Sequence, residues 1–120
     1  MSESIEPMSS VNISERADEL MEKAAQAHSG RATHVFRAIP KGSLSQVLLA
    51  LRKDHELSEH ENPGEALLHV LKGRVRLVVG DQSIDLGEDD HVVIPQHHHS
   101  LIALEDAAVF LTVVIQRPHI

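Results

Sequence analysis

Residues 66–79 read ALLHVLKGRVRLVV, and this stretch indicates how the chain folds. Apolar residues alternate along it on both sides of Lys72-Gly73, which is the pattern of two strands with one buried face. If Lys72-Gly73 is a two-residue hairpin turn, Val70 lies opposite Val75. The outward face then carries His69, Arg74 and Arg76. The face predicted to be interior consists of Ala66, Leu68, Val70, Val75, Leu77 and Val79.

The chain from residue 31 onward repeats this organisation. Short β-prone runs are separated by Gly, Pro, Asn and Asp, which is typical of a β-sandwich or β-barrel. The runs expected to form strands are 33–39, 44–52, 56–60, 66–71, 74–79, 82–86, 91–94, 99–104 and 107–115. The sequence therefore predicts a single all-β domain over residues 31–120.

The segment before this domain has a different period. Residues 1 to about 11 are expected to form a solvated tail, and apolar residues at helical spacing then predict an amphipathic helix over about 13–28. Asn12 can cap this helix, with Glu15 three residues later, and Gly30 is predicted to stop it. We expect the helix to pack against the domain or against a partner subunit.

Two of the predicted strands are apolar on both faces. They are LSQVLLAL at 44–51 and AAVFLTVVI at 107–115. In so small a domain, a strand buried on both sides needs a cover on its outer face. A second subunit is the economical cover, so we predict a homodimer.

Composition excludes several classes of function. The 120 residues include 11 Lys and Arg against 18 Asp and Glu, a net charge of −7 that argues against a nucleic-acid partner. No apolar run approaches the roughly 20 residues of a membrane helix, and the polar start does not match a signal peptide. The absence of Cys fits a cytoplasmic protein. The 10 His residues are unusual, because His is the commonest metal ligand.

The stretches HENPGEALLHVLKGRVRL and LGEDDHVVIPQHHHSLIALEDAAVFLTVV resemble a small single-domain cupin over roughly residues 40–115. The resemblance rests on the pattern H…PGE…VLKGRVRL, on the turn Gly87…Asp89 and on Pro95 leading to His99. It implies a double-stranded β-helix, or jelly-roll barrel, preceded here by a short helix. As a class, such proteins include dioxygenases, isomerases, decarboxylases, sugar-binding modules and storage proteins.

The resemblance also implies a metal site, which this sequence matches in part. His60 corresponds to the first His of the family pattern, and His99 to the His of its second motif. Asn62 stands where a second His is usual, and Ala66 stands at the Glu position. His97, His98 and His69 are weaker candidate ligands. A stable site for Zn²⁺, Fe²⁺, Mn²⁺, Ni²⁺ or Cu²⁺ normally needs three or more protein ligands, so the presence of a metal stays open.

Two functions follow from these residues, and the sequence leaves open whether the protein is an enzyme. The first is a metal-dependent enzyme of oxygenase, isomerase or lyase type, with the metal on His60 and His99 and a small polar molecule as substrate. Its pocket would be formed by Asn62, Leu68, Val70, Val75 and Leu77. The alternative is a non-enzymatic module with a metal-free barrel that binds or senses a small ligand. A structural module without any ligand is a third interpretation.

Overall fold

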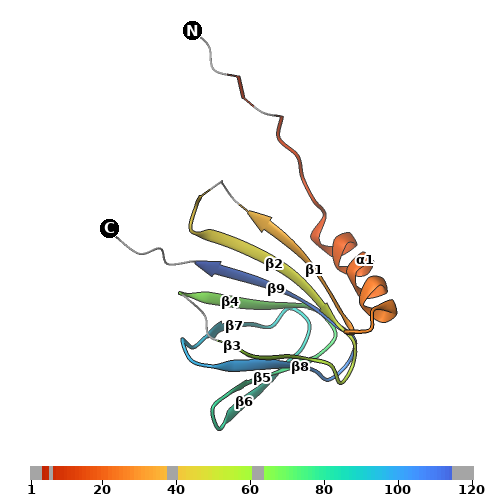
Figure 1. Cartoon of the computed structure of the whole chain (residues 1–120), viewed down its shortest axis with the longest axis vertical. Helices are drawn as coiled ribbons and strands as arrows, with labels where there is room; N and C mark the ends of the chain where they lie inside the picture. Colours follow the sequence, from red (N-terminus) through yellow and green to blue (C-terminus); the bar gives the residue numbers. More distant parts are fainter. Residues whose placement is uncertain (1–3, 6, 38–40, 61–63, 115–120) are drawn as a thin grey trace.

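The computed structural model describes residues 4–5, 7–37, 41–60 and 64–114, without the side chains of residues 37, 59 and 60 (Figure 1). Within these residues, one helix is followed by nine strands. The elements are α1 (Ile13–Gln26), β1 (Arg31–Arg37), β2 (Leu44–Leu51), β3 (Glu56–His60), β4 (Ala66–Lys72), β5 (Val75–Val79), β6 (Gln82–Leu86), β7 (His91–Ile94), β8 (His99–Ala103) and β9 (Ala107–Val114). Each predicted strand is present, with small shifts at its ends.

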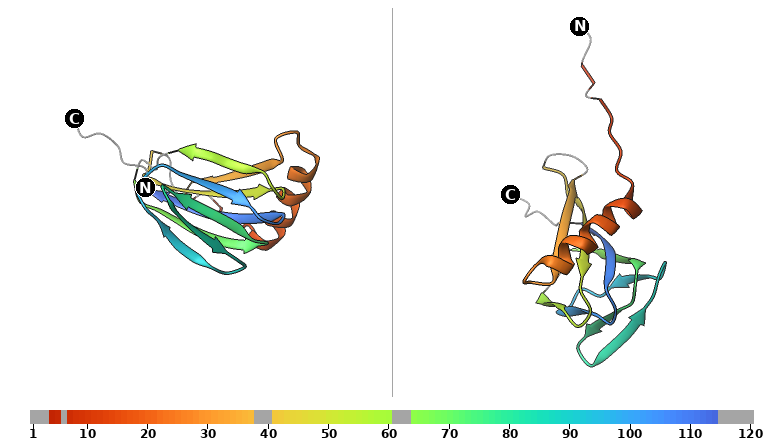
Figure 2. Two further views of the ribbon diagram at one scale, coloured as in Figure 1. Left: turned by 90° about the horizontal axis from the view of Figure 1, so that it is seen from below. Right: turned by 90° about the vertical axis from the view of Figure 1, so that its right-hand side faces the viewer.

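The strands form two antiparallel sheets that face each other (Figures 1 and 2). One sheet has the order β1-β2-β9-β4-β7, and the other has the order β3-β8-β5-β6. Strands distant in sequence are therefore neighbours, as in a jelly roll, where the chain passes repeatedly between two layers. This arrangement confirms the predicted all-β class with one N-terminal helix.

The predicted pairing of Val70 with Val75 is wrong, although the predicted faces are right. β4 pairs with β7 and β9, whereas β5 pairs with β6 and β8 in the other sheet. Gly73, at a φ of 74°, turns the chain from one sheet to the other, and a Cβ there would collide with the main-chain oxygen of Asp106. Alternation identifies the buried face of each strand but not its partner, so a hairpin and a corner between sheets give the same pattern.

The main core fills the space between the two sheets. Ala66, Leu68 and Val70 of β4 are at most 1% exposed, and Val75 and Leu77 of β5 are at most 3% exposed. The interior face expected from residues 66–79 is thus confirmed, with Val79 partly buried at its end.

A second core lies on the outer face of the larger sheet, under α1 (Figure 2). The small residues Ala17 and Ala24 bring the helix close to the sheet, where Leu48 and Ala108 are fully buried. The cover expected over strands 44–51 and 107–115 is therefore the helix of the same chain. The helix thus takes the place expected for a second subunit, and the homodimer stays a prediction.

The two ends of α1 depend on different residues. The Asn12 side chain accepts a hydrogen bond of 2.9 Å from the main-chain nitrogen of Glu15, as the cap prediction requires. The helix ends at Gln26, earlier than predicted, because Ala27 is already extended. Gly30 does not stop the helix: its φ is 68°, and the His55 ring occupies the space of a Cβ. In the described part of the chain, no helix has the length and apolar character to cross a membrane.

Candidate functional site

His99 is the one histidine that the structure buries among those whose side chains it describes, with 4% of the residue exposed. It begins β8, directly after a loop that starts at Pro95. Its Nδ1 lies 3.2 Å from the main-chain oxygen of His97. Because a carbonyl oxygen can only accept, Nδ1 donates the proton in this hydrogen bond, which orients the ring.

A pocket of about 50 Å³ lies between the sheets next to His99. Of the described residues that line it, His99 is the only polar one; the others are Leu57, Leu68, Leu77, Ile94, Leu101, Leu111 and Val113. The lining combines apolar walls with one hydrogen-bonding group, which is the usual chemistry of a small-molecule site.

Only part of the predicted pocket floor lines this cavity. Leu68 and Leu77 are in its wall, whereas Val70 and Val75 are fully buried further along their strands. Asn62 lies outside the described residues. The sequence interpretation missed the apolar walls contributed by β3, β7, β8 and β9. In β8, the residues at every second position, His99, Leu101 and Ala103, are buried. This alternation is the signal that could have identified Leu101 as part of the wall.

His60 and His99 are opposite each other in the antiparallel ladder between β3 and β8. The fold therefore brings these two predicted positions to neighbouring backbone sites, although the His60 side chain is not among the described atoms. Ala66, at the position of the expected Glu ligand, is 1% exposed and has no donor atom. The residues present therefore do not fit the complete ligand set implied by the resemblance. Among the described side chains, no group of three or more His, Asp or Glu is placed to hold a metal ion.

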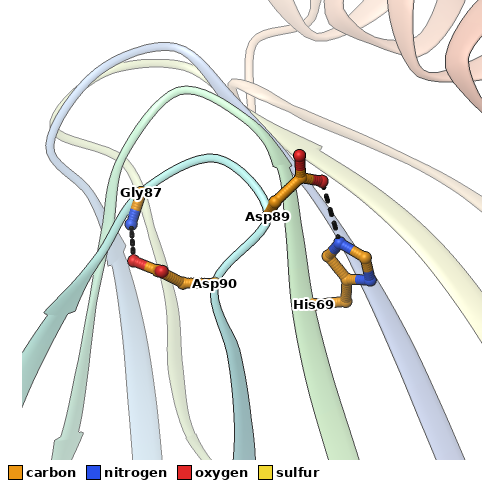
Figure 3. A network of polar contacts seen from close by, with 4 residues as sticks. All are labelled: His69, Gly87, Asp89 and Asp90. Atoms are coloured by element: carbon orange, nitrogen blue, oxygen red, sulfur yellow. Dashed lines mark hydrogen bonds and ion pairs between the residues drawn. The ribbon is translucent and has the colours of Figure 1, made fainter.

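The weaker candidate ligands lie elsewhere. His97 and His98 are exposed and line an open surface pocket of about 630 Å³, together with Gly80, Asp81 and other residues. His69 is on the outer face of β4, and its Nε2 lies 3.3 Å from Oδ1 of Asp89 (Figure 3). The structure thus does not bring His69 together with His99.

Hydrogen bonds hold the acidic turn between β6 and β7 in place (Figure 3). Oδ2 of Asp90 accepts a 2.8 Å hydrogen bond from the main-chain nitrogen of Gly87, which closes the turn. Asp89, at a φ of 66°, donates its main-chain N–H to the oxygen of Val70, and so attaches the turn to β4. These carboxylates are outside the pocket.

An ion pair with two hydrogen bonds also lies outside the pocket, on the outer face of the smaller sheet. Arg76 Nε lies 2.7 Å from Asp85 Oδ1, and Arg76 Nη2 lies 3.1 Å from Asp85 Oδ2. The hydrogen bonds from Arg76 lower the pKa of Asp85, and those to Asp85 raise the pKa of Arg76. The pair therefore joins β5 to β6, and neither of its charges lines the pocket.

Solved structures with the same architecture come from several bacteria. A conserved protein of unknown function from Streptococcus pyogenes has 20% identity, with 98% of each chain covered and a TM-score of 0.70. A cupin superfamily protein from Desulfitobacterium hafniense has 21% identity and a TM-score of 0.63, with 71% of this chain and 79% of that chain covered. At such identities, the similarity shows the fold alone.

Salicylate 1,2-dioxygenase from Pseudaminobacter salicylatoxidans also contains this fold. It has 17% identity and a TM-score of 0.71, and the match covers 83% of this chain but 33% of the dioxygenase. No curated protein matches the sequence significantly. Residues 47–115, more than half of the chain, match the family model described as "Cupin domain". The chain therefore belongs to the cupin family.

Proposed function

We propose that this cupin binds a small organic molecule inside the sandwich, with His99 as its polar contact. The observation that carries the proposal is the burial of His99 in the wall of a pocket whose other described lining residues are apolar. An imidazole in apolar surroundings fixes the orientation of a ligand through one hydrogen bond, while the leucine walls exclude water. This proposal is the non-enzymatic alternative of the sequence analysis, with His99 and the leucine walls as the binding residues.

The chemistry of the lining favours a ligand with one oxygen-bearing group and an apolar body. Leu57, Leu101 and Leu111 offer no second polar atom that would recognise a polyhydroxylated molecule. The chain has no Trp or Tyr, so the aromatic platforms that often stack on sugars are absent. We therefore rank small acids and alcohols above carbohydrates as ligands.

A ligand screen tests this function directly. Metal-free protein is heated with each member of a small library of acids, alcohols and sugars, because a ligand that binds only the folded state raises Tm. We expect stabilisation by an acid or alcohol in the wild type and in His91→Leu, which changes an exposed histidine. We expect none in His99→Leu. Stabilisation that persists in His99→Leu would overturn the proposal.

A metal-dependent enzyme is the second candidate, and the pairing of His60 with His99 favours it. Proteins of the cupin family often bind metals. A histidine that donates one ring N–H to a main-chain carbonyl, as His99 does, has the orientation common among metal-ligating histidines. A metal on two histidines would keep open positions for a small polar substrate of an oxygenase, isomerase or lyase reaction.

Elemental mass spectrometry of tag-free protein separates the two candidates. About one Zn, Fe, Mn, Ni or Cu per chain, lost in both His60→Ala and His99→Ala, supports the metal candidate. Metal that survives both changes but is lost when His97 and His98 are replaced belongs to the surface loop. That result, or no metal at all, overturns the metal candidate. A cytoplasmic homodimer without a nucleic-acid partner remains part of either proposal.

A further inference from the structure

The space beside His99 is much smaller than an ordinary ligand site. It measures about 50 Å³, whereas ligand pockets are typically about 300 Å³ or larger. If the proposed function holds, the inner pocket has room for a small group only. A ligand larger than that group would extend into a neighbouring space.

An apolar groove lies beside the inner pocket, at the edges of the two sheets. It has a volume of about 200 Å³ and lies between β6, an edge of the smaller sheet, and β7, an edge of the larger one. Its walls are mainly apolar, and they are formed by Leu77, Val79, Gln82, Ser83, Ile84, Val92, Val93 and Pro95. Leu77 also lines the inner pocket, so the two spaces are neighbours that share this side chain.

Ile84 is exposed to solvent although it lies on the inner face of its sheet. Ile84 is opposite Leu77 in the β5–β6 ladder, and directly opposed residues share one face of a sheet. Leu77 is 3% exposed on this inner face, whereas Ile84 is 48% exposed. A large apolar side chain on an inner face is normally covered by the opposite sheet. Here β6 leaves it open to the groove.

We propose that the ligand is a linear amphiphile whose oxygen-bearing head meets His99 and whose hydrocarbon chain passes Leu77 into the groove beside Ile84. The inference rests on the proposed function and names its ligand class. Leu77 lines both spaces, so the ligand would pass beside its side chain. The apolar walls of the groove and the half-exposed Ile84 match a hydrocarbon chain better than a polar molecule.

The probes are straight-chain alkanoates from propanoate to octanoate, with the matching 1-alkanols titrated in parallel by NMR. Burial of each further methylene is worth about 0.8 kcal/mol, which corresponds to about fourfold in Kd. We expect Kd to fall by about that factor for each added carbon once the inner pocket is full. Chemical shifts of Ile84 and Val92 should move only with the longer probes.

Two variants and one control test where the hydrocarbon chain of the ligand lies. Ile84→Ser removes an exposed groove contact and should flatten the dependence on chain length while propanoate still binds. Leu77→Phe narrows both spaces, because Leu77 lines the inner pocket as well as the groove, and should weaken the binding of every probe. Val35→Ser is the matched control, because Val35 is 51% exposed on β1 and does not line the groove. It should leave the whole series unchanged.

The outcomes separate this inference from the proposed function. If propanoate binds through His99 but affinity does not change with chain length, the function stands and the amphiphile is excluded. A chain-length dependence that survives in Ile84→Ser also overturns the inference. If no probe binds while the ligand screen identifies another His99-dependent ligand, the inference fails alone. If neither experiment detects binding at His99, both fail.

Discussion

The side chain of His99 hydrogen-bonds to the main-chain oxygen of His97, at 3.2 Å, two residues before it. The loop is closed further by the main-chain nitrogen of His97, which donates to the oxygen of Pro95 at 2.8 Å. Three consecutive histidines therefore have different environments: His97 and His98 are exposed, and His99 is buried. This difference makes His99 the centre of the candidate site.

Replacement of His99 tests the polarity of its surroundings. In His99→Leu, the lost hydrogen bond costs about 1 kcal/mol, and the gain from an apolar side chain in an apolar pocket is of similar size, so stability should change little. In His99→Asp, burial of a carboxylate beside the apolar described residues of the pocket should lower the free energy of unfolding by about 3 kcal/mol or more. Urea denaturation measures both, and a large loss in His99→Leu would contradict the apolar description of the pocket.

The corner between β4 and β5 should be intolerant of a side chain. Gly73→Ala places a Cβ against the main chain of Asp106, at a positive φ, and neither the backbone nor the turn can move cheaply. We expect a loss of about 3 kcal/mol, as for other strained backbone positions. Gly80→Ala is the control: its φ is 60°, but the space is open, so the loss should be about 1 kcal/mol. Equal losses would show that the close approach to Asp106 has no effect.

The helix should contribute to stability mainly through its buried face. Leu20 is 3% exposed in the core under α1, and Leu20→Ala should cost about 2–4 kcal/mol in unfolding free energy. Lys23→Ala, on the exposed side of the same helix, should change stability by less than about 0.5 kcal/mol. Thermal or urea unfolding compares the two. A similar small effect for both would mean that the helix is not packed on β2 and β9 in solution.

The ion pair between Arg76 and Asp85 should be visible in a pH titration. Hydrogen bonds from Arg76 lower the pKa of Asp85 from its ordinary value of 3.8, so the pair's stabilisation is fully present above that value. It is lost as pH falls through the lowered pKa of the folded protein. NMR of the side-chain carboxyl carbon should give a midpoint for Asp85 below 3.8, and Arg76→Gln should return it toward that value. An unchanged midpoint in Arg76→Gln would show that the pair does not persist in solution.

Much of the fold could be predicted from short-range pattern. The period of two in residues 66–79 assigned the buried face of β4 and β5, because successive side chains of a strand alternate whatever its partner is. The cap at Asn12 and the double-sided burial of residues 44–51 are equally local. The spacing around His60 and His99 identified two positions that the fold then placed opposite each other.

Only the tertiary structure decided which surfaces meet. Strand partners depend on contacts between distant segments, so Lys72-Gly73 became a corner, and the cover over Leu48 became α1. The pocket also depends on such contacts, because its wall combines residues from six strands, β3, β4, β5, β7, β8 and β9. The exposure of Ile84 follows from the edge position of β6, which no local pattern encodes. Sequence alone determined which side chains are apolar and on which face of a strand they lie, and only packing decided what each face contacts.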